Sequence, residues 1–457
     1  MSATARLIAA GWALARADAL IPREMEPLLP ARTRWAGRLV RLAAVGGPRR
    51  GRPGERLART LEGLGPAAIK LGQFLSTRSD VFGAEFAADL GRLKDRLPSF
   101  PIETAQAEVE AVLDRPIEAV FARFEPATAA ASLAQAHPAV LHDGRRVAVK
   151  VLRPGIERRV AEDSAVMRRA ARLAWRWAPT SRRLEPVALV ETVIRALELE
   201  LDLRMEAAGA DELGELMTRD DYMRAPPVVW DVVGRRVLCL GWAEGVALSD
   251  PRALEQPGLN RPALANNLTR GFLAQALDGG AFHADLHEGN LFAAAPATLT
   301  AIDFGIVGRL GPGERRYLAE ILWGFIRRDY PRVARVHFEA GYVPARHADA
   351  DFAQALRAVG EPIWGRPAGE ISMARLLTQL FEVTAQFEMR LRPELVLLQK
   401  TMVTVEGVAR RIDPDHDIWT AARPVVERWI RREFSPAAQV RRWVQGSGLG
   451  ARGRDVV

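Results

Sequence analysis

Two carboxylates and one amide stand at a spacing that suits the binding of magnesium and the chemistry of phosphate groups. Asp285 and Asn290 are five residues apart, and Asp303 lies 13 residues beyond Asn290. Carboxylate and amide oxygens are ligands that Mg²⁺ prefers, and a further carboxylate can position an attacking oxygen. The pattern predicts that Asn290 and Asp303 bind Mg²⁺ and that Asp285 is the catalytic carboxylate of a phosphoryl transfer.

The residues around this set follow the order found in protein kinases. Residues 283–290 read His-Ala-Asp-Leu-His-Glu-Gly-Asn, and residues 302–305 read Ile-Asp-Phe-Gly. Residues 291–293 and 298–302 are expected to pair as a hairpin through Pro296, which would bring the three side chains to one end of a small sheet.

Two histidines in the same segment allow a second interpretation. His283 and His287 are four residues apart, with Asp285 between them, which is a spacing seen in zinc sites on helices. The segment has the pattern of a loop and lacks the His-Glu-x-x-His order. We therefore expect His283 to brace the loop rather than to bind zinc.

A lysine upstream occupies the place where kinases bind nucleotide phosphates. Val147-Ala148-Val149-Lys150 matches the strand that carries this lysine. Asp143-Gly144 favours a hairpin before it, because such a turn needs positive φ at both residues. The chain has four lysines against 60 arginines, so a retained lysine suggests a need for a compact ammonium, the alternative being a surface lysine at a strand end. The acids that could hold it on the next long helical pattern are Glu198, Glu200, Asp202 and Glu206.

No Gly-x-Gly-x-x-Gly precedes Lys150, and an alanine-rich stretch at 127–136 occupies that place. Alanine resists the positive φ that glycine adopts freely, so this phosphate loop should be stiffer than a glycine loop. The residues expected to contact the nucleotide there are Ala129, Ala130, Ala131 and Ser132. The segment from Leu238 to Trp242 is expected to be the hinge that receives adenine, with Leu240 and Trp242 as its contacts.

Hydrophobic spacing and chain breakers predict the elements that position these residues. Helical spacing covers residues 1–45, 55–97, 103–113, 155–178 and 186–218, strands are expected at 228–230 and 236–240, and the chain from 262 onward is mainly helical except around 290–307. Pro66 stands where a first helical turn tolerates proline.

Composition narrows the class of protein. The 457 residues are 48% hydrophobic and 26% charged, which is typical of a folded chain, and Cys239 alone excludes an internal disulfide. No apolar run reaches the roughly 18 residues of a transmembrane helix, and the first residues lack the order of a signal peptide, so we expect a cytoplasmic protein. The net charge of +8 suggests an anionic partner, but the basic residues are too dispersed to indicate nucleic acid.

Taken together, the motifs resemble those of the UbiB/AarF family of atypical, protein-kinase-like kinases associated with ubiquinone (coenzyme Q) biosynthesis. The family's Lys-x-Gly-Gln looks like residues 70–73, its Ala-rich loop like 129–135, its Glu-x-Asp like 200–202, and its His-Ala-Asp-x-His-x-Gly-Asn like 283–290. The resemblance extends from about residue 55 to about residue 417.

The resemblance implies an α+β, bilobal protein-kinase-like fold with a helical N-terminal extension packed over the nucleotide cleft. The expected divisions are the extension with the Lys-x-Gly-Gln motif at 1–125, a small lobe at 126–245, a large lobe at 246–420 and a basic C-terminal tail at 421–457.

The resemblance also implies an unusual use of ATP and Mg²⁺. Glu206, four residues beyond Asp202, would pair with Lys150. Lys70 and Gln73 of the extension would lie near Glu200 and Asp202, where they would have a regulatory role and would disfavour a protein substrate. ATP hydrolysis, or transfer to a small lipid-like substrate such as a ubiquinone precursor, is then expected.

Two other functions stay open at this point. One is a nucleotide-gated lipid-binding or complex-assembly module with little catalysis, for which ubiquinone-synthesis proteins are candidate partners. The other, an ordinary protein kinase, is disfavoured by the absent glycine loop and by the extension that carries Lys70.

Three features depart from the family or stay ambiguous. Glu288 replaces the usual proline, and its carboxylate either perturbs the metal site or faces solvent, which we favour. Many bacterial members end in a pair of membrane spans, but the basic tail after Phe434 cannot span a bilayer. The N-terminal helix is either a packing helix with a solvated basic face or a peripheral contact with the anionic inner membrane. Its aromatic and basic residues are Trp12, Arg32, Arg34, Trp35, Arg38 and Arg41.

Overall fold

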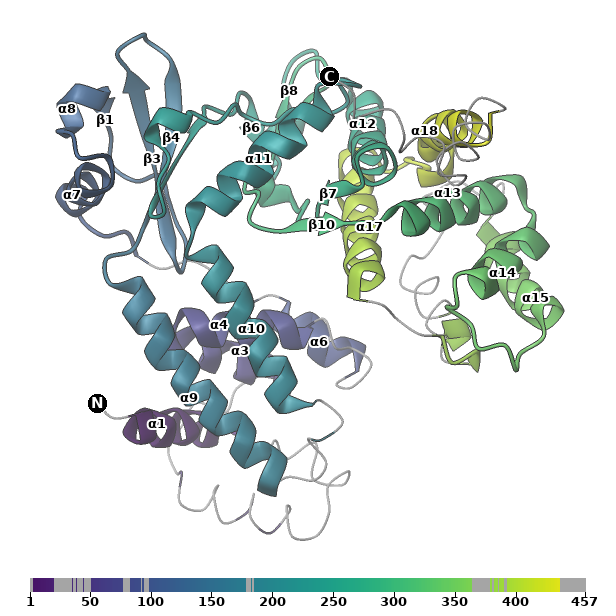
Figure 1. Cartoon of the computed structure of the whole chain (residues 1–457), viewed down its shortest axis with the longest axis horizontal. Coiled ribbons are helices and arrows are strands. Elements are labelled where there is room, and N and C mark those ends of the chain that lie inside the picture. The colour runs from purple at the N-terminus through teal and green to yellow at the C-terminus, as the bar shows by residue number, and fades with distance from the viewer. Residues whose placement is uncertain are drawn as a thin grey trace, which may run out of the picture. The chain divides into compact units, whose positions relative to one another are not determined.

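The computed structural model describes residues 3–19, 51–76, 83–91, 98–177, 185–363 and 393–435, together with a few residues between these stretches. The chain divides into two compact units (Figure 1). The first contains Met1–Ala207 and Val229–Trp242, and the second contains Ala208–Val228 and Ala243–Val457. Most of the predicted N-terminal arginines and the tail beyond residue 435 lie outside the described residues.

The helices of the first unit include two long neighbouring ones and several shorter ones. They are α1 (Ala3–Arg16), α3 (Pro53–Leu64), α4 (Pro66–Ser76), α6 (Ala84–Leu90), α7 (Ile102–Leu113), α8 (Ile117–Val120), α9 (Ile156–Trp177) and α10 (Pro186–Glu200). In Figure 1, α9 and α10 run beside each other; α4 contacts both of them and α1 contacts α9. Pro66 is the first residue of α4, as predicted, because its fixed φ suits a helical start.

A five-stranded antiparallel sheet completes the first unit. Its strands are β1 (Phe121–Phe124), β2 (Ala129–Ala130), β3 (Ala134–Leu141), β4 (Arg146–Leu152) and β5 (Val237–Gly241), in the order β1-β3-β4-β5, with β2 paired to β3. Val147, Val149 and Val151 of β4 are buried in the hydrophobic core. Successive side chains of a strand point to opposite faces, so Lys150 projects from the face opposite this core.

Two local predictions in this unit need correction. The β3–β4 hairpin forms as predicted, but only Gly144 has a positive φ, of 86°. Asp143 keeps an ordinary φ and accepts a hydrogen bond from the Arg145 amide (3.0 Å). The predicted strand at 228–230 is wrong, since Trp230–Val232 forms a 3-10 helix before β5.

The helical pattern predicted for 186–218 is interrupted at the Glu-x-Asp motif. The first helix, α10, ends at Glu200, and α11 (Leu203–Met217) begins three residues later. The Leu203 amide donates to the Arg235 carbonyl (2.9 Å) instead of to a preceding helical turn. Asp202 Oδ1 accepts from the Arg204 amide (3.2 Å), as short polar side chains do at helix starts. The break places the motif at a junction between two helices.

The second unit combines two small sheets with several helices. A three-stranded sheet contains β6 (Val246–Ala247), β8 (Leu291–Ala294) and β9 (Thr298–Ala301), and a two-stranded one contains β7 (Ala281–His283) and β10 (Val307–Arg309). The helices are α12 (Arg261–Ala274), α13 (Pro312–Arg327), α14 (Tyr330–Glu339), α15 (Asp349–Gly360), α17 (Pro393–Ile412) and α18 (Ile418–Glu433). The predicted β8–β9 hairpin through Pro296 is confirmed.

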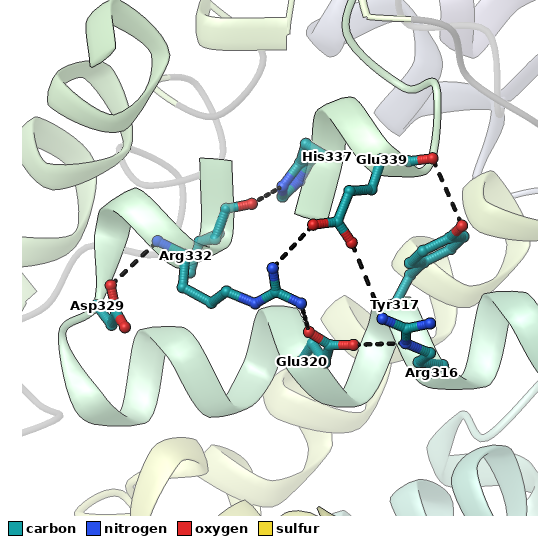
Figure 2. A network of polar contacts seen from close by, with 8 residues as sticks. Arg316, Tyr317, Glu320, Asp329, Arg332, His337 and Glu339 are labelled. Carbon is teal, nitrogen blue, oxygen red and sulfur yellow. Dashed lines mark hydrogen bonds and ion pairs between the residues drawn. The ribbon is translucent and has the colours of Figure 1, made fainter. Parts of the chain in front are cut away.

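A buried carboxylate fastens α13 to α14 (Figure 2). Glu320 of α13 is 6% exposed and accepts from Arg316 Nε (2.7 Å) and from Arg332 of α14. Arg332 also donates to Glu339 (2.8 Å), while the Asp329 side chain caps the start of α14.

A membrane span requires a helix that is both long and apolar. In the described part of the chain, no helix is both long enough and apolar enough to cross a membrane.

Candidate active site

In the first unit, Lys150 forms an ion pair with Glu206. Its Nζ lies 2.9 Å from each carboxylate oxygen of Glu206, which stands in the first turn of α11. Glu206 is 8% exposed, whereas the Lys150 side chain is 27% exposed. The pairing partner among the four predicted acids is therefore Glu206. The buried carboxylate has little access to water as an alternative hydrogen-bond donor. The ion pair therefore fixes the position of the Lys150 ammonium group.

The alanine-rich stretch forms a tight hairpin next to the lysine strand. Strand β2 pairs with β3, and Ala136 of β3 lies opposite Lys150 of β4. The turn is closed by a hydrogen bond from the Ala131 amide to the Ala134 carbonyl (2.8 Å), and the Arg153 guanidinium donates to the Ala131 carbonyl (2.8 and 3.0 Å). None of the residues Ala129, Ala130, Ala131 and Ser132 has a positive φ. This agrees with the resistance of alanine to positive φ, and the greater stiffness of the loop stays a prediction.

The two predicted hinge residues lie at the end of β5. Leu240 is buried and opposite Ala148 of β4. Trp242 donates its amide to the Arg146 carbonyl (3.1 Å), and the Arg146 guanidinium stacks 4.6 Å from the centroid of the Trp242 ring. Both residues therefore adjoin the strand of Lys150, and their contact with adenine stays a prediction.

The Lys-x-Gly-Gln motif lies on α4 and meets the Glu-x-Asp motif through one acid. Lys70 forms an ion pair with Glu200, and these side chains are 16% and 23% exposed. Asp202 instead binds Arg204 through its side chain (2.6 and 2.9 Å), and this hydrogen bonding lowers the pKa of Asp202. Gln73 accepts a hydrogen bond from Ser76 at its backbone carbonyl (2.6 Å).

In the second unit, His283 braces the loop that carries Asp285. The imidazole is fully buried; its Nε2 lies 3.0 Å from the Ile302 carbonyl, and its Nδ1 accepts from the Asp285 amide (3.1 Å). A carbonyl oxygen can only accept, so Nε2 carries the proton and the ring is neutral. Burial accordingly lowers the pKa of His283. Both ring nitrogens are engaged by the backbone, which leaves neither for a metal.

Asn290 is oriented by the backbone next to Asp285. Its Nδ2 donates to the Asp285 carbonyl (3.0 Å), so the amide oxygen is the atom that it can offer to a cation. Its carbonyl accepts from the Ile302 amide (2.9 Å), the residue directly before Asp303. Hydrogen bonds thus link Asn290 to Asp285 and to the residue before Asp303 within one unit.

Asp303 has a left-handed backbone with φ of 60°, which a non-glycine residue adopts at some cost in free energy. Phe304 beside it is buried, with its ring centroid 5.2 Å from that of His283. A Cβ atom added at Gly209 of α11 would lie 3.0 Å from the Val307 side chain and 3.2 Å from the Phe304 carbonyl oxygen. The segment after Asp303 therefore packs tightly against α11.

The donor set fits a magnesium ion better than a softer metal. Asn290 offers an amide oxygen and Asp303 a carboxylate, and hard cations such as Mg²⁺ bind through few such ligands when phosphate oxygens supply others. Among the described residues, no three His, Cys, Asp or Glu side chains gather as a metal site would need. The predicted protein ligands of a magnesium ion here are Asn290 and Asp303, and their binding of the ion stays a prediction.

Three contacts of this segment were missed in the sequence. Glu288 forms an ion pair with Arg411 of α17 and its side chain is 32% exposed, so its carboxylate is partly exposed and paired rather than freely solvated. The Gln275 side chain accepts from the His283 amide (3.0 Å), and the Thr401 hydroxyl lies 3.1 Å from the Ala284 carbonyl. These partners are separated in sequence from the segment, and no local signal indicates them.

Comparison with known proteins identifies the family. Residues 92–337 match the ABC1 atypical kinase-like domain, and residues 356–417 match the UbiB helical domain. This chain belongs to the ABC1/UbiB family of atypical kinase-like proteins. The resemblance to UbiB/AarF kinases is confirmed, and membership of the family indicates a kinase-type enzyme.

Relatives of this UbiB-family chain share most of its length. A probable protein kinase UbiB from Marinobacter nauticus is 40% identical over 393 residues, which are 85% of this chain and 72% of the relative. One from Pseudomonas paraeruginosa is 40% identical over 397 residues, with 86% and 74% covered. One from Xylella fastidiosa is 38% identical over 390 residues, with 84% and 71% covered.

A solved structure supports the fold. The Mycobacterium tuberculosis protein Rv3197, determined in complex with erythromycin, is 22% identical and has a TM-score of 0.56. The match covers 86% of this UbiB-family chain and 98% of that protein. The predicted α+β, kinase-like fold is confirmed, while the placement of the N-terminal helices over a nucleotide cleft stays a prediction.

Proposed function

We propose that this chain uses Mg-ATP to phosphorylate a small lipid-like acceptor or to hydrolyse ATP, in support of ubiquinone biosynthesis or membrane lipid homeostasis. The observation that carries the proposal is the bidentate contact of Lys150 with Glu206, 2.9 Å to each oxygen. Kinases use such a pair to hold the lysine at the α- and β-phosphates. The name of the UbiB family supplies the link to ubiquinone.

Each residue then has a defined task. Lys150 orients the nucleotide phosphates, and Asn290 and Asp303 hold Mg²⁺, with the Asn290 amide oxygen set by its bond to the Asp285 carbonyl. Bound Mg²⁺ stabilises the charge that develops on the transferred phosphoryl group. The Asp285 carboxylate orients the attacking hydroxyl or water and accepts its proton.

The proposed acceptor is small because the Lys70–Glu200 ion pair fastens α4 to α10. In the proposed mechanism, this fastened extension restricts access of protein substrates. A lipid-like acceptor also requires contact with a membrane, for which α1 is the candidate. Arg6 of α1 pairs with Glu162 of α9 (2.6 Å), whereas Ile8 and Trp12 are 68% and 48% exposed. Exposed apolar residues on a helix with a basic end suit an anionic membrane surface.

The decisive experiment measures Mg²⁺-dependent ATP hydrolysis by the wild type and by Asp285→Asn, with and without anionic liposomes. Hydrolysis that liposomes stimulate and that Asp285→Asn abolishes is the expected result. If both proteins bind ATP and neither hydrolyses it, the catalytic role of Asp285 is wrong, and a nucleotide-gated lipid-binding or assembly module becomes the better interpretation.

A binding measurement tests the observation that carries the proposal. Lys150→Met is expected to weaken ATP binding by about tenfold or more, because a charged hydrogen bond contributes roughly 1.5–3 kcal/mol. Lys400→Met is the matched control, since Lys400 is an exposed lysine on α17. Equal ATP affinity of the two variants would remove Lys150 from the nucleotide site.

A further inference from the structure

We propose that Arg411 of α17 is a positioning residue that sets the Mg²⁺-binding amide of Asn290 through Glu288. The inference rests on the proposed function, since it assumes that Asn290 binds Mg²⁺. Arg411 belongs to the part of the chain that matches the UbiB helical domain, whereas Glu288 and Asn290 belong to the kinase-like match. Under this proposal, the helical domain therefore acts on the metal site indirectly, through Glu288.

One guanidinium secures both ends of the turn that carries Asn290. Glu288, Gly289 and Asn290 form a single 3-10 turn, and Arg411 Nη1 forms an ion pair with the carboxylate of Glu288 at its start. Arg411 Nη2 donates to the Leu248 carbonyl (2.7 Å).

The second contact reaches the far end of the same turn. Leu248 is hydrogen-bonded through its amide to the carbonyl of Leu291 (2.8 Å), the residue directly after Asn290. These contacts and the backbone of residues 288–291 thus form a closed loop of connections that contains Gly289 and Asn290. We expect this loop to restrain the backbone that carries the Asn290 side chain.

The turn needs this restraint for a physical reason. Gly289 has no side chain to limit its backbone, and its amide is held within the turn by His287 Nδ1 (3.0 Å). Helix α17 also holds the preceding part of the loop, where the Thr401 hydroxyl lies 3.1 Å from the Ala284 carbonyl. One helix therefore touches the catalytic segment just before Asp285 and again just before Asn290.

The expected effect is moderate, because the pair is accessible to solvent. The side chains of Arg411 and Glu288 are 41% and 32% exposed, so water and salt weaken their attraction. Residues that orient metal ligands typically change metal affinity by about 10–100-fold, and screening reduces our expectation here to about three- to tenfold.

The test titrates Mg²⁺ at fixed ATP in the full-length protein and records the Mg²⁺ concentration for half-maximal ATP binding. Arg411→Gln and Glu288→Gln should each raise it by about three- to tenfold, and the double variant should be no worse than either single one, because they remove the same interaction. ATP affinity in EDTA should stay unchanged, which a general loss of structure would not allow.

The control is Arg431→Gln, which removes an arginine paired with Glu427 within α18 and leaves the catalytic segment untouched. Arg411→Lys is a conservative second variant, whose single ammonium cannot serve Glu288 and Leu248 with the geometry of a planar fork. Its Mg²⁺ concentration for half-maximal ATP binding should lie between the values of the wild type and Arg411→Gln.

Two results are distinguishable from each other. If the ATP affinity of the wild type does not depend on Mg²⁺, both the proposed function and this inference are wrong. Mg²⁺-dependent binding that Arg411→Gln leaves unchanged, or strictly additive effects of the two substitutions, would overturn this inference alone.

Discussion

Lys70 forms an ion pair with Glu200 and thereby ties α4 to the last residue of α10. Six residues further on, beyond the break between α10 and α11, Glu206 takes Lys150. Two of the chain's four lysines are thus paired on either side of one helix junction. We therefore expect a change at this junction to affect both the packing of the N-terminal helices and the position of Lys150.

The Lys70–Glu200 pair leads to the first prediction. Lys70→Ala should loosen α4, lower the free energy of unfolding by about 1 kcal/mol, and change nucleotide preference or raise ATP turnover. Hydrogen exchange of α4 amides and hydrolysis of several nucleotides measure these effects. Asp202→Asn is the matched control, because Asp202 binds Arg204 instead. A Lys70→Ala variant with wild-type exchange and turnover would contradict the shielding role.

Asp303→Asn is expected to remove Mg²⁺-dependent ATP binding while leaving the fold intact. Asparagine has the size of aspartate and also tolerates the left-handed backbone at this position, so the local conformation should persist. ATP binding should be titrated with and without Mg²⁺, and thermal unfolding should be recorded beside it. Unchanged Mg²⁺-dependent affinity in a folded variant would remove Asp303 from the metal site.

Acid should destabilise the protein through its buried histidines. Burial lowers the pKa of His283 and of His337, whereas an unfolded histidine titrates near 6.5. Below that pH the unfolded state binds protons that the folded state excludes, so the free energy of unfolding falls as pH drops from about 7.5 to about 5.5. Each such histidine contributes up to about 1.4 kcal/mol over this range.

Replacement of one histidine checks the assignment. His337 packs edge-on against Phe352 and Tyr342, so His337→Phe should fold and should show a smaller loss of stability on acidification than the wild type. Urea unfolding at the two pH values measures the difference. If the free energy of unfolding depends on pH identically in the two proteins, His337 makes no contribution to the loss of stability in acid.

The network in Figure 2 gives a stability prediction. Glu320→Gln removes the buried charge that Arg316 and Arg332 share, and we expect a loss of about 1–2 kcal/mol in the free energy of unfolding, since both arginines are partly exposed. Glu427→Gln, which affects a more exposed pair with Arg431, should cost less than about 0.5 kcal/mol. Equal losses in the two variants would show that burial of Glu320 does not matter.

The local elements that carry the predicted site residues were readable in the sequence of this protein. Asp285 and Asn290 are five residues apart, and Lys150 follows a run of alternating strand residues. Short-range backbone geometry therefore already determines the loop or strand that carries each of them. The β8–β9 hairpin and the start of α4 at Pro66 were predictable for the same reason. Turn and capping preferences act over only a few residues.

The partners of these residues were decided only by tertiary structure. Four acids were candidates for Lys150, and Glu206 takes it because the chain breaks at Asp202 and starts a new helix there. Glu288 finds Arg411 from 123 residues away. Contacts of this range depend on how helices pack, and side chains of equal charge are interchangeable until packing brings one of them within reach. Residue types therefore determined the chemistry that the predicted site offers, and packing determined which of these residues contact one another.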